Sequence, residues 1–393
     1  MKKYKLGDLL SEFHAGKAIQ TENIKNKGAY PVYGGNGRRG YTDSYNQDGE
    51  YLIIGRQGAY CGNVRYNIGK AYLTEHAIVG QTREDHNPIY IALKLSLMKL
   101  SQLQGQSAQP GLSVNTLSCI SMEMPPKEIQ DKIADIMLKL DRKIELNRQI
   151  NDNLEAMAKQ LYDYWFVQFD FPNEEGKPYK SSGGAMVWND KLKREIPQGW
   201  HCGTLLDIAE YTNGLACQKY RPTDNNKLPV IKIKEMHDGL SADTEWVKAD
   251  IPDDVKVFDG DVLFSWSASL EIMLWAYGNG GLNQHIFKVT SKNGYPRSFY
   301  FYQLIHYVGV FKQIAEARKT TMGHITQDHL RQSTIALPPN IDVANKLEEK
   351  LCPIFDAIVK NNQEIMALTK QRDELLPLLM NGQASVNYHL SDD

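Results

Sequence analysis

Cysteine is scarce in this sequence, and its few copies are scattered. Five cysteines occur among 393 residues, an odd number, and no two are spaced as CxxC. A disulfide framework or a structural zinc site needs cysteines at close, regular spacings. The sequence therefore argues against both classes of protein and favours a reducing compartment such as the cytoplasm.

Long apolar runs are also absent. No segment approaches the roughly 18–20 apolar residues that a helix needs to cross a bilayer. Residues 1–13, MKKYKLGDLLSEF, carry positive charge without the apolar core of a secretion signal. We therefore expect neither a membrane-spanning helix nor a leader.

Recognisable catalytic motifs are missing as well. Each Gly-Lys pair lacks the earlier glycine of a phosphate-binding loop. Asn87-Pro88-Ile89-Tyr90 lacks the second proline of a methyltransferase signature, and Pro252-Asp253 with Lys256 lacks the spacing of a nuclease motif. His76 and His285 are isolated, and an isolated histidine on a strand more often packs than catalyses. The sequence predicts a protein that is not an enzyme.

Neither sign of charge is in excess. The chain has 45 basic and 47 acidic residues, a net charge of −2. Because nucleic-acid-binding domains are often basic, any surface of that kind has to be local here. The hydrophobic content of 42% is ordinary for a globular protein, and the length predicts two or more domains.

The most informative feature that is present is an internal repeat. Six short segments recur in the same order, at an offset that begins near 198 residues and settles near 211. The matched pairs are Leu6–Leu9 with Leu206–Ile208, Tyr30–Val32 with Leu228–Val230, Asp48–Leu52 with Asp259–Leu263, Glu75–Ile78 with Gln284–Phe287, Gly111/Ser113/Leu117 with Gly323/Thr326/Leu330, and Met124–Pro126 with Leu337–Pro339. Generic turns would explain the glycines but not the shared order, so the pattern indicates a duplication.

The first part of each repeat is expected to be a mixed domain. Tyr51–Ile54 and Val262–Phe264 are short apolar runs beside glycines, which predicts buried strands. Residues 89–103 and 299–318 have apolar spacings typical of helices.

The second part of each repeat is expected to be a long helix. After Pro125-Pro126 and after Pro338-Pro339, apolar residues recur every three or four positions, with Asn147 and Asn151 as polar interruptions. Proline suits a helix start because its missing N–H is not needed there. About 40 residues would make a helix of about 60 Å. A long and narrow apolar stripe is typical of a helix that packs against a partner helix. The other repeat supplies the only comparable helix.

Between the repeats, residues 170–197 are rich in glycine, serine and proline. This composition predicts a loop long enough to let the second repeat dock again.

Candidate DNA-binding residues come from loops that recur in both repeats. Arginine and glutamine read base edges, and lysine or arginine neutralises phosphate. Each loop alone is more simply a solvated turn, and the hypothesis depends on recurrence. We expect Lys219–Arg221 and Ser265–Ser267 to occupy places comparable with those of Arg38-Arg39 and Arg56–Tyr60. The candidates are Arg38, Arg39, Arg56, Gln57, Tyr60, Ser107, Gln109, Lys219, Arg221, Trp266, Ser267, Arg318, Lys319 and His324. Unequal loops predict two different half-sequences, hence an asymmetric target.

The segment between the repeats resembles a known family. Trp165–Asn173, Gly176–Gly184 and Ile196–Trp200 are similar to the spacer of the specificity subunits of type I restriction-modification enzymes. Gly260–Ser265 and the paired Pro-Pro helix starts are similar to other shared elements of that family, and the resemblance covers nearly the whole chain.

The resemblance implies an α+β fold with two target recognition domains on a long antiparallel two-helix coiled coil, related by a pseudo-two-fold repeat. The implied domains are 1–125 and 198–337, the helices 126–168 and 338–382, the linker 169–197, and the flexible tail 383–393. Each domain would read half of a bipartite DNA sequence, and the helices would fix the gap.

The resemblance also implies partners. The helices would dock two modification subunits, which carry the S-adenosylmethionine chemistry, and restriction subunits would use ATP and Mg. This chain itself would hold no cofactor and no metal. The complex would act on double-stranded DNA in the cytoplasm of a bacterium or archaeon.

Two alternatives stay open at this point. The chain could be a coiled-coil adaptor that joins proteins without reading DNA, which the acidic net charge allows. It could also be a fused or degenerate methyltransferase, which binding of S-adenosylmethionine by the isolated chain would reveal.

Overall fold

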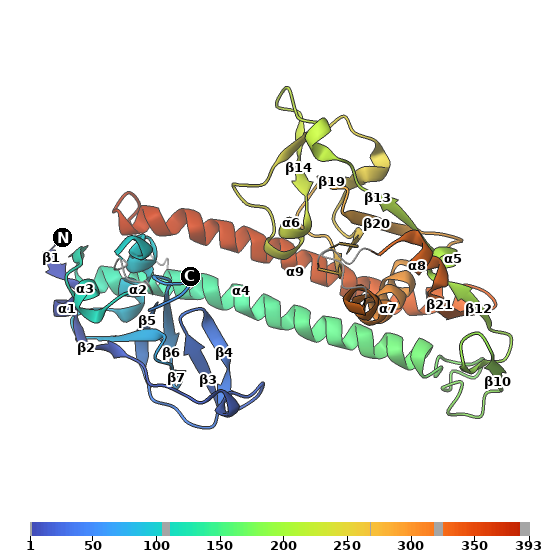
Figure 1. Ribbon diagram of the computed structural model, residues 1–393, viewed down its shortest axis with the longest axis horizontal. Helices are drawn as coiled ribbons and strands as arrows, with labels where there is room; N and C mark the ends of the chain where they lie inside the picture. Colours follow the sequence, from blue (N-terminus) through green and yellow to red (C-terminus); the bar gives the residue numbers. More distant parts are fainter. Residues whose placement is uncertain (1, 104–110, 268, 318–324, 386–393) are drawn as a thin grey trace, which may run out of the picture. The chain divides into compact units, whose positions relative to one another are not determined.

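The structure, a computed structural model, describes residues 2–103, 111–267, 269–317 and 325–385 (Figure 1). The chain divides into two compact units. Unit 1 comprises Met1–Arg142 with Thr369–Asp393, and unit 2 comprises Lys143–Leu368. The predicted recognition domains 1–125 and 198–337 each fall inside one unit, and each unit also holds a part of both long helices. None of the helices in the described part of the chain is long and apolar enough to cross a membrane.

The main sheet of unit 1 is antiparallel. Its strand order is β2 (Leu10–Ala15), β8 (Ala77–Thr82), β5 (Glu50–Gly55) and β6 (Val64–Ile68). Leu52 and Ile54 of β5 belong to the larger core, whereas Tyr51 and Ile53 belong to a smaller core that includes Leu73. Because successive side chains of a strand point to opposite faces, this strand is buried on both. That double burial explains its continuous apolar run and confirms the predicted strand.

A second, smaller sheet completes the strand framework of unit 1. In it β3 (Tyr30–Gly34) pairs antiparallel with β4 (Gly37–Thr42) and parallel with β7 (Tyr72–Leu73). The remaining elements are β1 (Lys2–Lys5), paired with β9 (Ser121–Met124), and the helices α1 (Leu6–Leu9), η1 (Thr21–Asn23), α2 (Pro88–Ser96), η2 (Leu100–Leu103) and α3 (Val114–Ser118).

The helix predicted over 89–103 is wrong in its second half. Helix α2 ends at Ser96, and Leu100–Leu103 is a separate 3₁₀ turn. The Ser96 hydroxyl donates to the Leu93 carbonyl at 2.7 Å, a local bond that competes with the helical ladder. The apolar spacing continues beyond Ser96, which is why the sequence did not show this end.

Unit 2 repeats the strand order and the strand directions of unit 1. Its main sheet runs β13 (Ala209–Asn213), β20 (Ile286–Ser291), β17 (Val262–Ser265), β18 (Glu271–Leu274). Its smaller sheet runs β15 (Trp246–Lys248), β14 (Lys227–Ile231), β19 (Gly280–Leu282), β16 (Lys256–Val257), with β14 parallel to β19 as β3 is to β7. This shared topology confirms the duplication.

The other elements of unit 2, most of which match unit 1 in the same way, complete its framework. They are β12 (His201–Thr204), which pairs with β21 (Thr334–Leu337), and the helices α5 (Leu205–Ile208), η4 (Cys217–Lys219), α6 (Ile233–Asp238), η5 (Asp253–Val255), α7 (Arg297–Ala317) and α8 (Gln327–Gln332). The residues inserted in the second repeat lie between β14 and β17, where α6 and η5 have no counterpart in unit 1.

The two long helices are α4 (Lys127–Tyr162) and α9 (Asp342–Met380). Within unit 2, Lys143 and Asn147 of α4 both contact Glu364, and Asn151 contacts the Ile358 carbonyl, so the helices run antiparallel. Within unit 1, the early residues Ile133 and Met137 share a core with the late residues Leu376 and Leu379, which gives the same direction.

Helix α9 contains two prolines that the apolar pattern hides. Pro353 and Pro377 lie in its interior, where a proline removes a backbone donor and costs about 3 kcal/mol or more. Pro353 is flanked by the fully buried Leu351 and Phe355. Packing within unit 2 thus keeps the helix continuous at Pro353, as tertiary packing commonly overrides local preference.

The segment predicted as a loop between the repeats is folded instead. Strands β10 (Met186–Asn189) and β11 (Arg194–Pro197) form a hairpin. Phe171 stacks on Trp200 with ring centroids 5.4 Å apart, and the buried Asp170 carboxylate accepts bonds from the Ser181 backbone N–H and hydroxyl at 2.7 and 2.6 Å. Composition showed the turns of this segment but not the aromatic core that orders them.

Candidate nucleic-acid interface

In unit 1, the ends of several strands meet at one place. The chain leaves β5 at Arg56, whose backbone N–H donates to the His76 carbonyl at 2.9 Å. The Arg56 carbonyl accepts from the Leu112 N–H at 2.9 Å, and Gln57 forms an isolated bridge with Gly111. These bonds join the loop after β5 to the start of β8 and to the approach to α3.

Glycines let the turns at this place pack backbone against backbone. A Cβ at Gly55 would lie 2.4 Å from the Tyr60 carbonyl oxygen and 2.8 Å from that of Gly35. Gly37 has φ 101°, in the left-handed region, and a Cβ there would lie 2.5 Å from an Arg65 guanidinium nitrogen. The Gly34–Gly37 turn is therefore built around close approach as well as backbone conformation.

The side chains at this meeting point carry the chemistry of base and phosphate contact. The half-buried Arg56 guanidinium donates to the Glu75 carbonyl at 3.5 Å, and the Gln57 amide oxygen lies 3.3 Å from His76 Nδ1. Arg65 donates to the Asn36 carbonyl at 3.4 Å and is exposed. The sequence analysis missed Arg65, because nothing in the pattern of β6 places it beside the glycine-rich turn.

Arg38 and Arg39 lie at an irregularity in the pairing of β4 with β3. The pairing register shifts at this point, so Arg39 has no pairing partner in β3. Arg39 lies against Gly34, and Arg38 lies over the Tyr41 ring at 5.2 Å. Both arginines are exposed, and Tyr60 is 47% exposed. All three side chains are accessible to a ligand.

The same backbone arrangement recurs in unit 2. The Trp266 N–H donates to the His285 carbonyl at 3.3 Å, and the Trp266 carbonyl accepts from the Ile325 N–H at 3.0 Å. Trp266 thus occupies the framework position that Arg56 occupies in unit 1. Its indole N–H donates to the Asn213 side chain at 3.0 Å, and its ring lies 5.6 Å from the His285 ring.

The duplicated framework presents different side chains at equivalent points. One unit offers a guanidinium and the other an indole, and Gln57 corresponds to Ser267, which is buried with 5% exposure. Burial leaves the Ser267 side chain without access to a ligand, in contrast to the prediction. His76 and His285 lie at these positions, although isolated histidines suggested packing. The recurrence of a histidine at the same place in both repeats was the sequence feature that could have pointed to this position.

Lys219 and Arg221 do not occupy the place comparable with Arg38 and Arg39, so that part of the interpretation is wrong. Lys219 lies in η4 and Arg221 just after it, before β14, whereas Arg38 and Arg39 follow β3. The counterpart of η4 in unit 1 is η1. A basic pair beside tyrosine is a local composition, and composition does not fix a place in the strand order.

Five candidates, Ser107, Gln109, Arg318, Lys319 and His324, lie outside the described residues. Gly111 and Ile325, the described residues that follow these segments, are tied to Gln57 and Trp266 by the contacts above.

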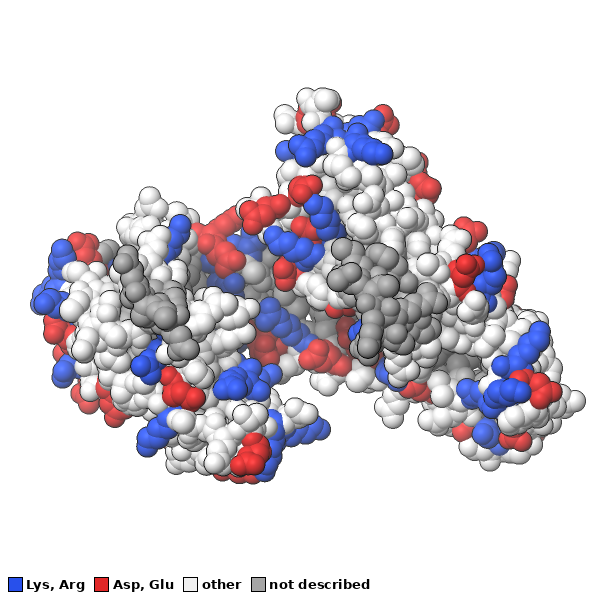
Figure 2. Space-filling view, in the orientation of Figure 1, with Lys and Arg blue, Asp and Glu red and all other residues white. Residues whose placement is uncertain are grey.

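Charge is distributed as the composition led us to expect. Figure 2 shows Lys and Arg interspersed with Asp and Glu on both units, with a local group of Lys and Arg at the end of unit 2 that holds β14. On the face shown, basic side chains gather only in patches, and attraction for an anionic ligand is local to them.

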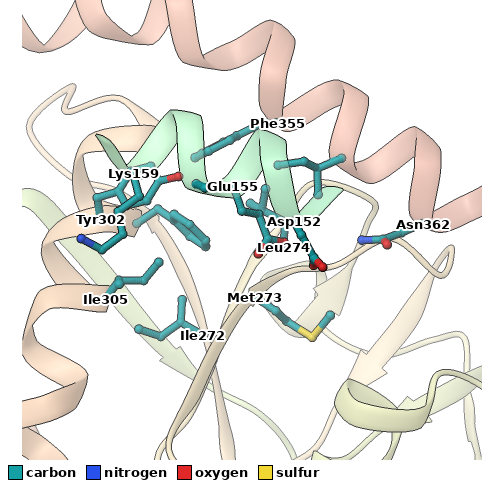
Figure 3. Close-up of a pocket in the computed structure, with 13 residues that line it drawn as sticks. Asp152, Glu155, Lys159, Ile272, Met273, Leu274, Tyr302, Ile305, Phe355 and Asn362 are labelled. Atoms are coloured by element: carbon teal, nitrogen blue, oxygen red, sulfur yellow. The ribbon is translucent and has the colours of Figure 1, made fainter. Parts of the chain in front are cut away.

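A pocket of about 460 Å³ opens in unit 2 between α4, α7, β18 and α9 (Figure 3). Its walls include Ile272, Leu274 and Phe355, with Asp152 and Glu155 on the side of α4. Desolvation, with a contribution from Asp152, raises the pKa of Glu155. The described lining brings no nucleophile and base together, so the pocket has the character of a packing groove between helices.

Taken together, the fold and the two equivalent loop sites define a duplicated recognition protein built on an antiparallel helix pair. The chain belongs to the family described as Type I restriction modification DNA specificity domain, which it matches over residues 1–156 and 197–371. Its role lies accordingly in DNA sequence specificity. Nothing in these comparisons supports the adaptor alternative.

Individual relatives agree with the family match. The chain is 27% identical over 379 residues to the type I restriction enzyme MjaIX specificity subunit of Methanocaldococcus jannaschii, covering 88% of this chain and 84% of the relative. It is 41% identical over 144 residues to the EcoprrI specificity subunit of Escherichia coli, covering 36% of each. A crystal structure of a type I restriction-modification S subunit from M. genitalium shares the fold, with a TM-score of 0.64, 14% identity and coverage of 96% and 95%.

Proposed function

We propose that each unit reads one half of an asymmetric, bipartite DNA target, and that the paired helices α4 and α9 set the unread gap between the halves. The observation that carries the proposal is the framework position shared by Arg56 and Trp266. A duplication retains the backbone that presents the reading side chain, while the side chain itself differs. Two readers with different chemistry select two different half-sequences.

The reading side chains suit base edges. An arginine can donate two parallel hydrogen bonds to guanine, and a glutamine can pair with adenine. Arg56 and Gln57 stand next to each other on a loop that backbone bonds fix on two sides. In unit 2 the Trp266 N–H is committed to Asn213, so the exposed part of its ring offers an apolar contact instead, such as a thymine methyl group accepts.

Docking of partner subunits is supported by an exposed apolar stripe on the helix pair. Leu146, Ile150 and Met157 of α4 are 55%, 38% and 58% exposed, and Tyr164 just beyond it is 36% exposed. Their spacings of four and seven residues place them on one helical face. An exposed apolar stripe on a helix is typical of a partner-binding surface. The proposed partners are two modification subunits.

Chemistry is assigned to those partners. S-adenosylmethionine would bind to the modification subunits, and ATP with Mg to restriction subunits, while this chain supplies recognition without a cofactor or a catalytic group of its own. The assembled complex would act on double-stranded DNA in the cytoplasm.

Mapping methylated adenines in cells that carry this chain and its modification partner tests the proposal. We expect methylation at one sequence made of two short defined elements, of unlike sequence, separated by a gap of fixed length and free composition. Methylation at an uninterrupted sequence, or at a palindrome, would contradict two unlike readers. The isolated chain should bind no S-adenosylmethionine. Binding would instead favour the alternative that the chain is itself a methyltransferase.

A further inference from the structure

Two lysines in unit 2 face each other across a strand pair. Lys227 of β14 and Lys248 of β15 are directly opposite in the antiparallel register. Like charges in this relation destabilise a sheet. Lys227 is exposed and Lys248 is half-buried, and within the described parts of the chain neither forms an ion pair.

Aromatic rings hold these two ammonium groups without neutralising them. Lys227 Nζ lies 4.5 Å from the centroid of the Trp246 ring, and Lys248 Nζ lies 5.6 Å from that of Tyr220. The Lys248 N–H also donates to the Tyr220 carbonyl at 2.9 Å. A cation over a ring face keeps its full charge, so the pair stays available to an anion.

Two acidic residues of this region of unit 2 are bound to other cations. Glu245, next to Trp246, pairs with Lys232 at 2.5 Å, and Asp253 pairs with Lys256 at 2.7 Å. The hydrogen bond from Lys232 lowers the pKa of Glu245, and the charge of Arg221 adds a weaker effect in the same direction. The missing counter-charge at Lys227 and Lys248 is therefore a local feature of this strand pair.

In unit 1, the position equivalent to Lys248 carries a charge that is neutralised within the unit. Pro31 pairs with Tyr41 as Pro229 pairs with Trp246, so Asp43 of unit 1 corresponds to Lys248. Asp43 forms an ion pair with Lys25 at 2.7 Å. The unneutralised lysine pair is thus confined to the second repeat.

We propose that Lys227 and Lys248, with the exposed Lys219 and Arg221 on either side of Tyr220, form a site for the phosphate groups of the DNA backbone. We call these four residues the unit 2 basic cluster. The site lies close to the reading position along the chain, because Asn213, which binds the Trp266 indole, ends the strand that leads into η4. Phosphate contacts fix the register of a protein on the duplex without specifying sequence. The unit 2 basic cluster rests on the proposed function and adds a positioning contact beside one half-site.

The double variant K227Q/K248Q in complex with modification subunits tests this site. We expect binding to cognate and to unrelated duplexes to weaken by the same factor. For two lost phosphate contacts, the slope of log K against log salt should fall by about 1.8. The methylated sequence should stay the same. Because the substitutions remove a like-charge pair, the Tm of the isolated chain should hold or rise, which also shows that the variant folds.

The matched control is K234Q in the same unit. Lys234 is exposed and lies 3.8 Å from Asp243, so its loss should leave the salt slope near that of the unaltered complex. A double variant with the salt slope of the unaltered complex would overturn the phosphate site. A double variant that methylates a different sequence would overturn its role in positioning. By contrast, an unaltered complex without sequence preference would refute the proposed function itself.

Discussion

Asn151 and Asn361 bind each other across the two long helices. Asn361 Nδ2 donates to Asn151 Oδ1 at 2.8 Å, and Asn151 Nδ2 donates to Asn362 Oδ1 at 2.9 Å. Asn151 is 5% exposed. A buried amide between helices is satisfied in one register and left without partners in others, and the second case costs about 1–3 kcal/mol. The pair therefore specifies how α4 and α9 are aligned within unit 2.

Replacing Asn151 by Leu should separate register from stability. We expect the Tm to hold or rise, because an apolar residue suits a helix interface better than an amide. We expect the gap between the methylated half-sequences to lose its single length, because the helices can then slip. Sequencing of methylated adenines reads the gap. Asn153→Leu, at an exposed position of the same helix, is the control and should keep one gap. A single unchanged gap in Asn151→Leu would show that the amides do not set the register.

Acidification should weaken the contact of the helices at Glu364. Hydrogen bonds from Lys143 and Asn147 lower the pKa of Glu364. A carboxylate with a lowered folded-state pKa adds stability above its unfolded pKa, and this contribution disappears as the pH falls through the folded value. The Tm of Glu364→Gln should therefore decrease less between pH 7 and about pH 3 than the Tm of the unaltered chain does. Glu349→Gln, exposed on α9, should lose as much as the unaltered chain. An equal decrease in Tm for all three chains would show that the Glu364 carboxylate does not stabilise the helix pair.

Arg56 should determine one half of the target. For Arg56→Ala we expect a loss of about 1–3 kcal/mol in discrimination at one base pair and no change in the other half. Affinities for the cognate duplex and for duplexes with single base changes give this value. Arg56→Lys keeps the charge but not the fork of donors, so it should resemble Arg56→Ala. Full discrimination in Arg56→Lys would indicate a phosphate contact.

The exposed stripe on α4 should control assembly with the modification subunits. Met157→Asp and Leu146→Asp should weaken copurification of those subunits at least tenfold, because each would bury a charge without a partner. The fold should survive, since both side chains point outward in the free chain. Ile68→Asp is the control, as Ile68 is 47% exposed on β6 of unit 1 and is not part of the stripe on α4. Normal assembly in the two α4 variants would move the docking surface elsewhere.

Much of the fold could be predicted because the duplication and the helical periodicity are visible in short stretches of the sequence. The Pro-Pro pairs mark both helix starts within a few residues, and the buried strands at Tyr51 and Val262 appear as apolar runs. The parallel pairing of β3 with β7 could not be predicted, because the residues of neither strand identify the distant strand with which it pairs. The hairpin at 186–197 was missed for the same reason: Phe171 and Trp200 order it from outside its own sequence.

The candidate site was predicted in part. Arg56, Gln57 and Trp266 came from recurrence, and the structure gives Arg56 and Trp266 equivalent backbone bonds. Arg65 and the Lys227–Lys248 pair depend on which strands are neighbours. Cross-strand position is set by tertiary register, which a single sequence does not display.

Exchange of residues 1–125 for those of a relative with another target tests the central claim most directly. The modular account predicts that methylated adenines then define a new sequence in one half, with the other half and the gap length unchanged. A change in both halves, or in the gap, would contradict two independent readers held apart by the helix pair.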